Sequence, residues 1–384
     1  MIIDDDAEAA VRAGAVEVLR ASWRETDGFC PPNPEVYPHQ WLWDSCFHAI
    51  AWSALGEGGR GVRELTSSLD GQLDSGFVPH MRYLGPSANR GPLADRSSFT
   101  QPPIYAHAAR VLAGAGHDPG AALVGRIASG LDWLWRHRRT PEGLIYVVHP
   151  WETGTDDSPR WDDWVCLPGY DHAAYSAFDR ELVAETFFDS TGAAVWSRSF
   201  ASAPASFNAL CAHAALECAV LTADDRWRER GEELAGVADD LLWDEREGLW
   251  IDRPLIGGGP RCRVPTLDGT LGALVTDDAG KAERALAQLS DPGRFGAPYG
   301  PAYLPRRHPT YDPGEYWRGA AWPQLSYLSA LAAERWGDDA TYAGIRERSY
   351  AGALASGFAE YWNPETGEGL GAIPQGWAAV VAAL

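Results

Sequence analysis

Residues 149–164 read HPWETGTDDSPRWDDW and place five acids among three tryptophans around a Gly-Thr turn. Such a segment cannot pack as a regular helix or strand, so we expect a loop. Clustered acids can bind Ca²⁺, but the ligand spacing of an EF-hand is absent. Indole rings beside a carboxyl group exclude water and raise its pKa, which is what a general acid requires. We interpret this loop as one wall of a carboxylate-based active site.

A second acid with aromatic neighbours stands near the end of the chain. Glu360 lies between Phe358 and the pair Tyr361 and Trp362, in the loop GFAEYWNPETGEGLG. The alternative interpretation is an exposed glutamate just past a helix end. Each acid alone is more often structural than catalytic, so the assignment depends on whether the fold brings the two loops together.

Other long loops supply polar and aromatic candidates for binding a substrate. In YPHQWLWDSCF, Asp44 follows Trp41 and Trp43 at a helix start, where it could bind sugar hydroxyls or cap the helix. The segment YDPGEYWRGAAWPQ adds Trp317 and Arg318. The motifs SGFVPHMRYLG and SSFTQPP add three more residues, of which the last could instead be a helix cap: Arg82, Tyr83 and Gln101.

Hydrophobic periodicity predicts twelve helices that alternate between two kinds. One kind is charged on one side, as outer helices are: 7–24, 62–73, 123–136, 227–242, 279–289 and 342–358. The other kind is apolar nearly all round, as buried inner helices are: 43–55, 102–112, 207–221, 267–275, 322–333 and 377–384.

The connections between these helices also alternate in length. Those that lead from an outer to an inner helix are long and rich in Gly, Pro and Trp, and in an up-and-down array they all lie at one end. This pattern predicts an all-α fold, an (α/α)6 barrel of six outer and six inner helices, with long loops over one end that form the functional pocket. We expect residues 1–384 to form one catalytic domain. The alternative is an irregular helical domain or a solenoid.

The composition excludes several classes of function. A formal charge of −21 disfavours binding to nucleic acid or to an anionic membrane. No run of about 18 apolar residues is present, and the start MIIDDDAEAA is acidic where a signal peptide is basic, so we expect a cytoplasmic protein. Six scattered cysteines indicate neither a disulfide framework nor a zinc site. We expect no metal or cofactor, and the sequence leaves a homo-oligomer open.

Five motifs in order, QWLWDSCF, SSFTQPP, GTDDSPRWD, YWRGAAWP and FAEYWNPETGEGLG, resemble those of glycoside hydrolase family 63. Within it, they are similar to the bacterial mannosylglycerate and glucosylglycerate hydrolases. The resemblance implies the (α/α)6 barrel and hydrolysis of a small α-glucoside or α-mannoside with inversion. It places the acid at Asp156 and the base at Glu360. It places sugar-binding positions at the following residues: Trp41, Trp43, Asp44, Gln101, Trp317 and Arg318.

Asp157 departs from the resemblance, since an asparagine is expected there, and it leaves open which of Asp156 and Asp157 is the acid. The segment 71–100 predicts a lid over a closed pocket, which favours a disaccharide-sized substrate. If that substrate is an acid such as glucosylglycerate or mannosylglycerate, Arg82 could grip its carboxylate with two hydrogen bonds, or it could pair with a surface acid.

Other functions stay open at this point. A trehalase-like or other oligosaccharide α-glucosidase would use the same two carboxylates. A sugar epimerase on the same barrel would depend on histidine bases, for which the sequence offers His39, His48, His107 and His213. A carbohydrate-binding protein without catalysis would keep the pocket alone, but the chain retains both acids.

Overall fold

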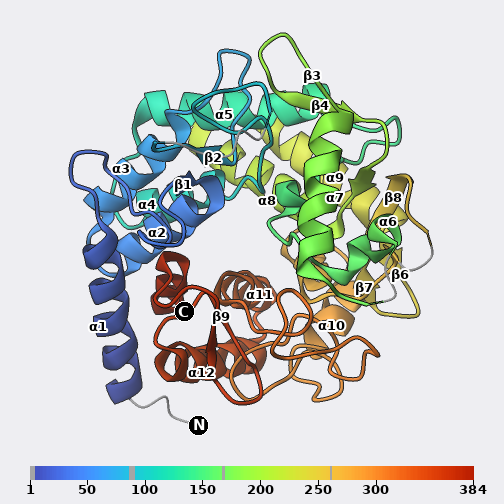
Figure 1. Ribbon diagram of the computed structural model, residues 1–384. Helices are drawn as coiled ribbons and strands as arrows, with labels where there is room; N and C mark the ends of the chain where they lie inside the picture. Colours follow the sequence, from blue (N-terminus) through green and yellow to red (C-terminus); the bar gives the residue numbers. More distant parts are fainter. Residues whose placement is uncertain (1–4, 86–90, 167–168, 260–261) are drawn as a thin grey trace.

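The computed structural model describes residues 5–85, 91–166, 169–259 and 262–384, and its helices form the predicted (α/α)6 barrel (Figure 1). Six outer helices correspond to the predicted charged set: α1 (Asp5–Ser22), α3 (Gly58–Leu69), α5 (Gly120–His137), α9 (Asp225–Leu241), α10 (Ala279–Ala287) and α12 (Asp339–Ser356). Six inner helices correspond to the apolar set: α2 (Leu42–Ala54), α4 (Tyr105–Gly114), α8 (Ala205–Thr222), η4 (Leu267–Leu274), α11 (Pro323–Arg335) and η5 (Gly376–Ala383). Each inner helix contacts the next, and η5 closes the ring against α2.

Burial follows the two sequence patterns. In α2 every residue from Leu42 to Trp52 is buried. In α9 the buried residues recur every three or four positions, which gives one apolar face against α8 and leaves the charged face in solvent. Helix α8 is long and apolar enough to cross a membrane. Because it is packed in the ring between α4, α9 and η4, we assign it to the core of the barrel.

Two inner helices differ in type from the prediction, because η4 and η5 wind as 3₁₀-helices. Both contain glycines against which a neighbouring side chain is pressed. A Cβ atom at Gly272 would lie 2.2 Å from the Trp250 ring, and one at Gly376 would lie 2.3 Å from His48 Nε2. These side chains pack directly against the backbone of η4 and η5, which both form short, tightly wound helices.

The stretch between α5 and α8 contains a helix that the sequence did not predict. Helix α7 (His172–Glu185) starts at Asp171, whose side chain accepts hydrogen bonds from the backbone N–H groups of Ala173 and Ala174. Strands β3 (Thr186–Phe188) and β4 (Ala194–Ser197) follow it as an antiparallel pair. Figure 1 shows α7 (green) beside the barrel opening. Its buried residues are few, which explains why hydrophobic periodicity did not reveal it.

Short antiparallel strand pairs occur in the long loops. Two of them join different loops, and the other two are hairpins within one loop. The pair β1 and β2 joins the loop before α2 to the loop before α4. The pairs are β1 (Gln40–Trp41) with β2 (Met81–Arg82), β5 (Ala201–Ala203) with β8 (Arg253–Ile256), β6 (Trp243–Asp244) with β7 (Leu249–Trp250), and β9 (Tyr361–Trp362) with β10 (Gly369–Leu370).

Two buried arginines anchor the acidic loop 149–164, which folds as η1 (Pro150–Thr153), η2 (Pro159–Trp161) and α6 (Asp162–Val165). On one side, Arg138 binds Glu152 at 2.6 Å, and both side chains are fully buried. On the other, Arg160 binds Asp252 at 3.0 Å and Asp268 at 2.6 Å. The loop is therefore fixed at both ends by charge pairs that cannot separate without leaving a buried charge.

We expect Arg138→Met to lower the free energy of unfolding by about 3–5 kcal/mol, because it leaves the Glu152 carboxylate buried without its cation. The matched control is Arg136→Met. Arg136 forms an exposed i,i+4 pair with Asp132, for which we expect a loss of at most about 1 kcal/mol. Urea unfolding followed by circular dichroism measures both. Equal, small losses in the two variants would contradict the anchoring role of Arg138.

Candidate active site

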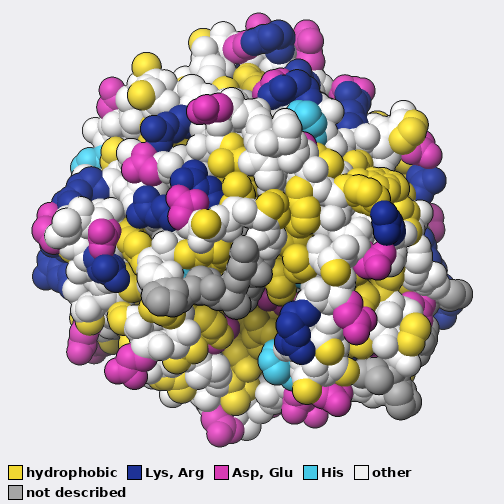
Figure 2. All heavy atoms as spheres, turned by 45° about the horizontal axis from the view of Figure 1, so that its top comes forward, with side chains coloured by type: hydrophobic (Ala, Val, Ile, Leu, Met, Phe, Trp, Pro, Cys, Tyr) yellow, Lys and Arg dark blue, Asp and Glu magenta, His cyan; other side chains and the backbone are white. Residues whose placement is uncertain are grey.

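Two cavities that share a wall open at the barrel mouth. The inner cavity has a volume of about 120 Å³ and the outer one about 930 Å³. In the face turned forward in Figure 2, hydrophobic side chains lie along a hollow in the surface. Four residues line both cavities, so the two are parts of one site: Tyr37, Asp156, Tyr316 and Glu360. The structure therefore brings the acidic loop and the last long loop together, as the fold prediction required.

Glu360 is held rigidly at the boundary of the two cavities. It follows α12 and is 3% exposed. The Tyr37 hydroxyl lies 3.2 and 3.1 Å from the two carboxylate oxygens, and the N–H of Ala372 donates to one of them at 3.0 Å. Burial raises the pKa of Glu360 to about 6, against the opposing effect of these hydrogen bonds. A carboxylate with this pKa suits a general base that works near neutral pH.

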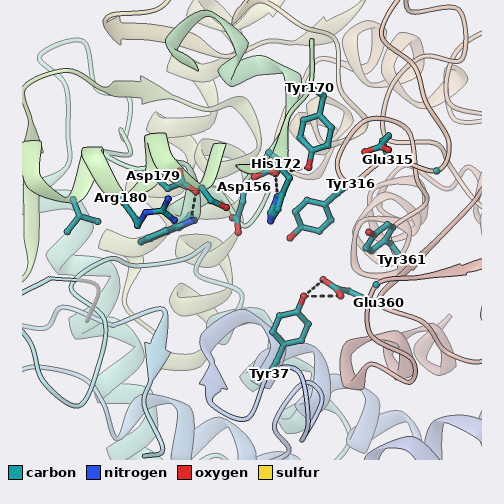
Figure 3. A pocket seen from close by; sticks show the side chains of 16 residues that line it. Tyr37, Asp156, Tyr170, His172, Asp179, Arg180, Glu315, Tyr316, Glu360 and Tyr361 are labelled. Carbon is teal, nitrogen blue, oxygen red and sulfur yellow. Dashed lines mark hydrogen bonds and ion pairs between the residues drawn. The ribbon is translucent and has the colours of Figure 1, made fainter. Parts of the chain in front are cut away.

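Asp156 faces the cavity from the other side (Figure 3). The chain reaches it through Gly154, which has φ +70° and lies against the indole of Trp43. A Cβ atom at Gly154 would lie 2.4 Å from that ring, so only glycine fits this turn. The close approach directs Asp156 into both cavities.

Asp157 points differently from its neighbour. It lines the outer cavity alone, and its side chain is 4% exposed. One carboxylate oxygen accepts hydrogen bonds from the Tyr170 hydroxyl at 2.8 Å and from His172 Nδ1 at 2.7 Å. Of the two adjacent acids, Asp156 is thus the one that reaches the shared boundary opposite Glu360.

Four predicted binding residues line the inner cavity: Trp41, Trp43, Asp44 and Gln101. Burial raises the pKa of Asp44 to about 7, and the side-chain amide of Gln375 donates to its carboxylate at 3.5 Å. Gln101 does not cap the helix that follows it, because α4 begins at Tyr105 with Ile104 as its N-cap. Its side-chain oxygen instead accepts the N–H of Trp43 in the first turn of α2 at 3.2 Å.

The other four predicted binding residues lie outside both cavities. Arg82 donates to the Ser67 backbone oxygen at 3.3 Å and to the Ser67 hydroxyl at 3.2 Å, because β2 turns its side chain toward α3. Tyr83 is buried beside His39, with 5.6 Å between the ring centroids. Arg82 and Tyr83 are therefore not placed to touch a ligand in this pocket.

Trp317 and Arg318 lie behind the pocket wall. Trp317 adopts φ +55° and stacks on Trp322 at 3.6 Å, which buries it completely. Arg318 donates to both oxygens of Asp162 at 3.0 and 2.8 Å. It lines a neighbouring cavity of about 600 Å³, separated from the site by Tyr170 and Glu315. Both residues thus support the pocket wall instead of forming its surface.

Several lining residues were not singled out from the sequence. Three of them stand inside the motifs already quoted, where the acids and tryptophans drew attention away from tyrosine: Tyr37, Tyr316 and Tyr361. The others on the outer cavity come mainly from α7, for which the sequence carries no motif: His172, Ser176, Asp179, Arg180 and Val183. Two tryptophans of the acidic loop differ in position, since Trp151 lines the outer cavity whereas Trp161 is buried.

Two groups of side chains outside the site have atoms close enough together to hold a metal ion. In one, His107 lies 3.3 Å from Glu217 and 3.2 Å from His213. In the other, Glu64 receives hydrogen bonds from Cys30 N–H and Ser45 and lies 3.2 Å from His48. Within the described part of the chain, neither group lines the two cavities, and the hydrogen bonds inside each account for its arrangement.

Residues 37–378 match the family described as the mannosylglycerate hydrolase MGH1-like glycoside hydrolase domain. The chain is 31% identical to a mannosylglycerate hydrolase of Thermus thermophilus, over 96% of this chain and 98% of that protein. It is 30% identical to a glucosylglycerate hydrolase of Mycolicibacterium hassiacum, over 90% and 91% of the two chains.

A crystal structure of a family 63 mannosylglycerate hydrolase of Thermus thermophilus with Tris and D-glycerate superimposes with a TM-score of 0.82. It is 28% identical, and the match covers 97% of this chain and 99% of that one. Fold, site and sequence therefore agree. The protein is a glycoside hydrolase that belongs to the mannosylglycerate hydrolase MGH1-like family.

Proposed function

We propose that the protein hydrolyses the α-glycosidic bond of mannosylglycerate or glucosylglycerate with inversion at the anomeric carbon. The observation that carries the proposal is the placement of Asp156 and Glu360 on opposite sides of one pocket, at the boundary of its two cavities (Figure 3). We take the substrate class from the relatives of the chain, which are mannosylglycerate and glucosylglycerate hydrolases.

In this mechanism Glu360 is the general base and Asp156 the general acid. Glu360 removes a proton from a water molecule as that water attacks the anomeric carbon, and Asp156 protonates the departing oxygen. Inverting enzymes leave room for the water by separating their carboxyl groups by about 6.5–9.5 Å. Tyr37 and the Ala372 N–H keep the base oriented, because both hydrogen-bond to its carboxylate.

The inner cavity is the sugar site in this proposal. Trp41 and Trp43 offer aromatic faces, and Asp44 with Gln101 offers groups that hydrogen-bond to hydroxyls. The leaving group then occupies the outer cavity on the Asp156 side. Because Arg82 is directed toward Ser67, the proposal assigns it no part in binding a substrate carboxylate.

A trehalase-like or oligosaccharide α-glucosidase activity is the second candidate. The outer cavity, at about 930 Å³, has room for a leaving group larger than glycerate, which favours this activity. An epimerase is less well supported, because His39, His48, His107 and His213 do not line either cavity. A carbohydrate-binding protein without catalysis would not require an oriented base such as Glu360.

We propose a cytoplasmic protein whose partner is a small carbohydrate and which binds neither nucleic acid nor membrane. The support is the net charge of −21 and the position of α8 inside the barrel.

The first test is a panel of α-mannosides and α-glucosides that includes mannosylglycerate, glucosylglycerate, trehalose and maltose. We expect mannosylglycerate or glucosylglycerate to give the highest kcat/KM. Proton NMR during the first minutes should show the β-anomer of the released sugar, because water attacks from the face opposite to the leaving group. Preferential cleavage of trehalose or maltose would replace the proposed substrate with the second candidate.

The second test separates the acid from the base. We expect Asp156→Ala and Glu360→Ala each to lower kcat by roughly 10²–10⁴-fold on the glycerate substrate. A glycosyl fluoride, whose leaving group needs little protonation, should restore much of the activity of Asp156→Ala and little of that of Glu360→Ala. Asp157→Ala should keep more activity than Asp156→Ala, and the reverse order would move the general acid to Asp157.

The third test uses the pKa of Glu360. Since the base must be unprotonated, kcat/KM should fall as the pH is lowered through about 6. The Tyr37 hydrogen bond lowers this pKa by stabilising the carboxylate, so Tyr37→Phe should move the acidic limb to higher pH. Tyr170→Phe is the control, because Tyr170 binds Asp157 and should leave the limb in place. An unmoved limb in Tyr37→Phe would argue against Glu360 as the base.

A further inference from the structure

Helix α7 presents one face to the outer cavity. His172, Ser176 and Arg180 are spaced four residues apart and all line that cavity, as the helical repeat requires. In Figure 3 the imidazole of His172 extends from α7 toward the middle of the pocket, beside Asp156 and Tyr316, whereas Arg180 lies farther along the helix. The unpredicted helix therefore forms the wall nearest the proposed leaving group.

His172 is fixed in this position by the acid that follows Asp156. Its Nδ1 donates to Asp157 at 2.7 Å, so Nε2 is the ring atom left for a ligand. The side chain is 68% exposed, while that of Asp157 is 4% exposed and also accepts the Tyr170 hydroxyl. A solvent-accessible imidazole held by a buried carboxylate is a preorganised binding group.

Most charged side chains that line the outer cavity are acidic, whereas His172 is basic. Five acids line it: Asp156, Asp157, Asp179, Glu315 and Glu360. Among the described lining residues the basic side chains are His172 and Arg180, both on α7. An anionic leaving group would be repelled elsewhere in the cavity, so it must bind against α7.

Distance decides between the two basic residues. In any glycoside of glycerate, the carboxylate lies only two or three bonds from the oxygen that Asp156 protonates. Arg180 follows His172 by eight residues, about 12 Å along a helix. The residue that contacts such a carboxylate must lie near the acid. His172 meets this condition, because it binds Asp157, the next residue in the chain, and lines the same cavity as Asp156.

We propose that His172, held by Asp157, binds the carboxylate of the leaving group and thereby selects anionic α-glycosides over neutral ones. The inference rests on the proposed function and adds a specificity-determining residue to it. In the complex the ring lies between two carboxylates and donates to both, Nδ1 to Asp157 and Nε2 to the ligand. Arg180 contributes a more distant positive charge.

The experiment compares two substrates with the same sugar, a glycosylglycerate and the matching glycosylglycerol, in which CH₂OH replaces the carboxylate. We expect His172→Gln to lower kcat/KM on the anionic substrate by about tenfold or more, the loss typical of a charge-assisted hydrogen bond. The neutral substrate should change by less than about threefold. Arg180→Gln should lower the anionic-to-neutral ratio less, because of its distance.

Two further variants separate binding from folding. His137→Gln, at the end of α5 and outside both cavities, is the control and should leave the ratio unchanged. His172→Arg restores a cation and should recover part of the ratio. Equal loss on both substrates in His172→Gln, or an unchanged ratio, would overturn the inference while leaving the proposed function intact.

A binding measurement keeps the two proposals distinguishable. If the wild-type enzyme cleaves no glycosylglycerate, the proposed function fails, and titration calorimetry with D-glycerate still tests the site. We expect D-glycerate to bind the wild type more tightly than glycerol does, and His172→Gln to remove that difference. Equal affinity of D-glycerate for the wild type and His172→Gln would overturn the site.

Discussion

The active site depends on the rule that a buried charge must be paired. Arg138 and Arg160 are both buried, and their ion pairs fix the loop that carries Asp156 at two points, at Glu152 before that residue and at Arg160 after it. Glu152 also accepts the backbone N–H of Val148 at 2.7 Å. Breaking either contact would strand a charge in the barrel wall, so the loop has one favourable path. A loop with few regular hydrogen bonds thereby acquires the rigidity that a general acid needs.

Burial of carboxyl groups in the barrel raises their pKa values. Asp44 lies in the first turn of the inner helix α2 and Glu360 lies in the loop between α12 and η5, and desolvation raises the pKa of each. At Glu360 the hydrogen bonds from Tyr37 and Ala372 oppose this effect, and the result is a pKa of about 6. At Asp44 the neighbouring carboxylates of Glu360 and Glu64 add to the effect of burial, and the pKa reaches about 7. The same wall therefore gives one group that is mainly ionised at neutral pH and one that is ionised only in part.

The sequence predicted those features that repeat along the chain and missed those that depend on distant partners. Periodicity located all twelve barrel helices, because each buries one face or its whole surface. It could not show that Arg318 would bind Asp162, 156 positions away, or that Arg82 would turn toward Ser67. Periodicity did not predict helix α7, because this helix packs over the barrel mouth with few buried residues. Motifs identified the walls of the site, but side-chain directions came from contacts between elements.

The pair of adjacent acids shows how such contacts distinguish two residues that look alike in the sequence. Two neighbouring carboxylates repel each other, and the sequence alone does not show which of them faces the substrate. Here the Asp157 carboxylate has partners of its own, since it accepts hydrogen bonds from Tyr170 and His172 and does not line the inner cavity. Asp156 is left as the member of the pair at the boundary where a glycosidic oxygen would lie. In the proposed mechanism, the carboxylate that replaces the expected asparagine is therefore held by His172 of α7 while Asp156 acts as the acid.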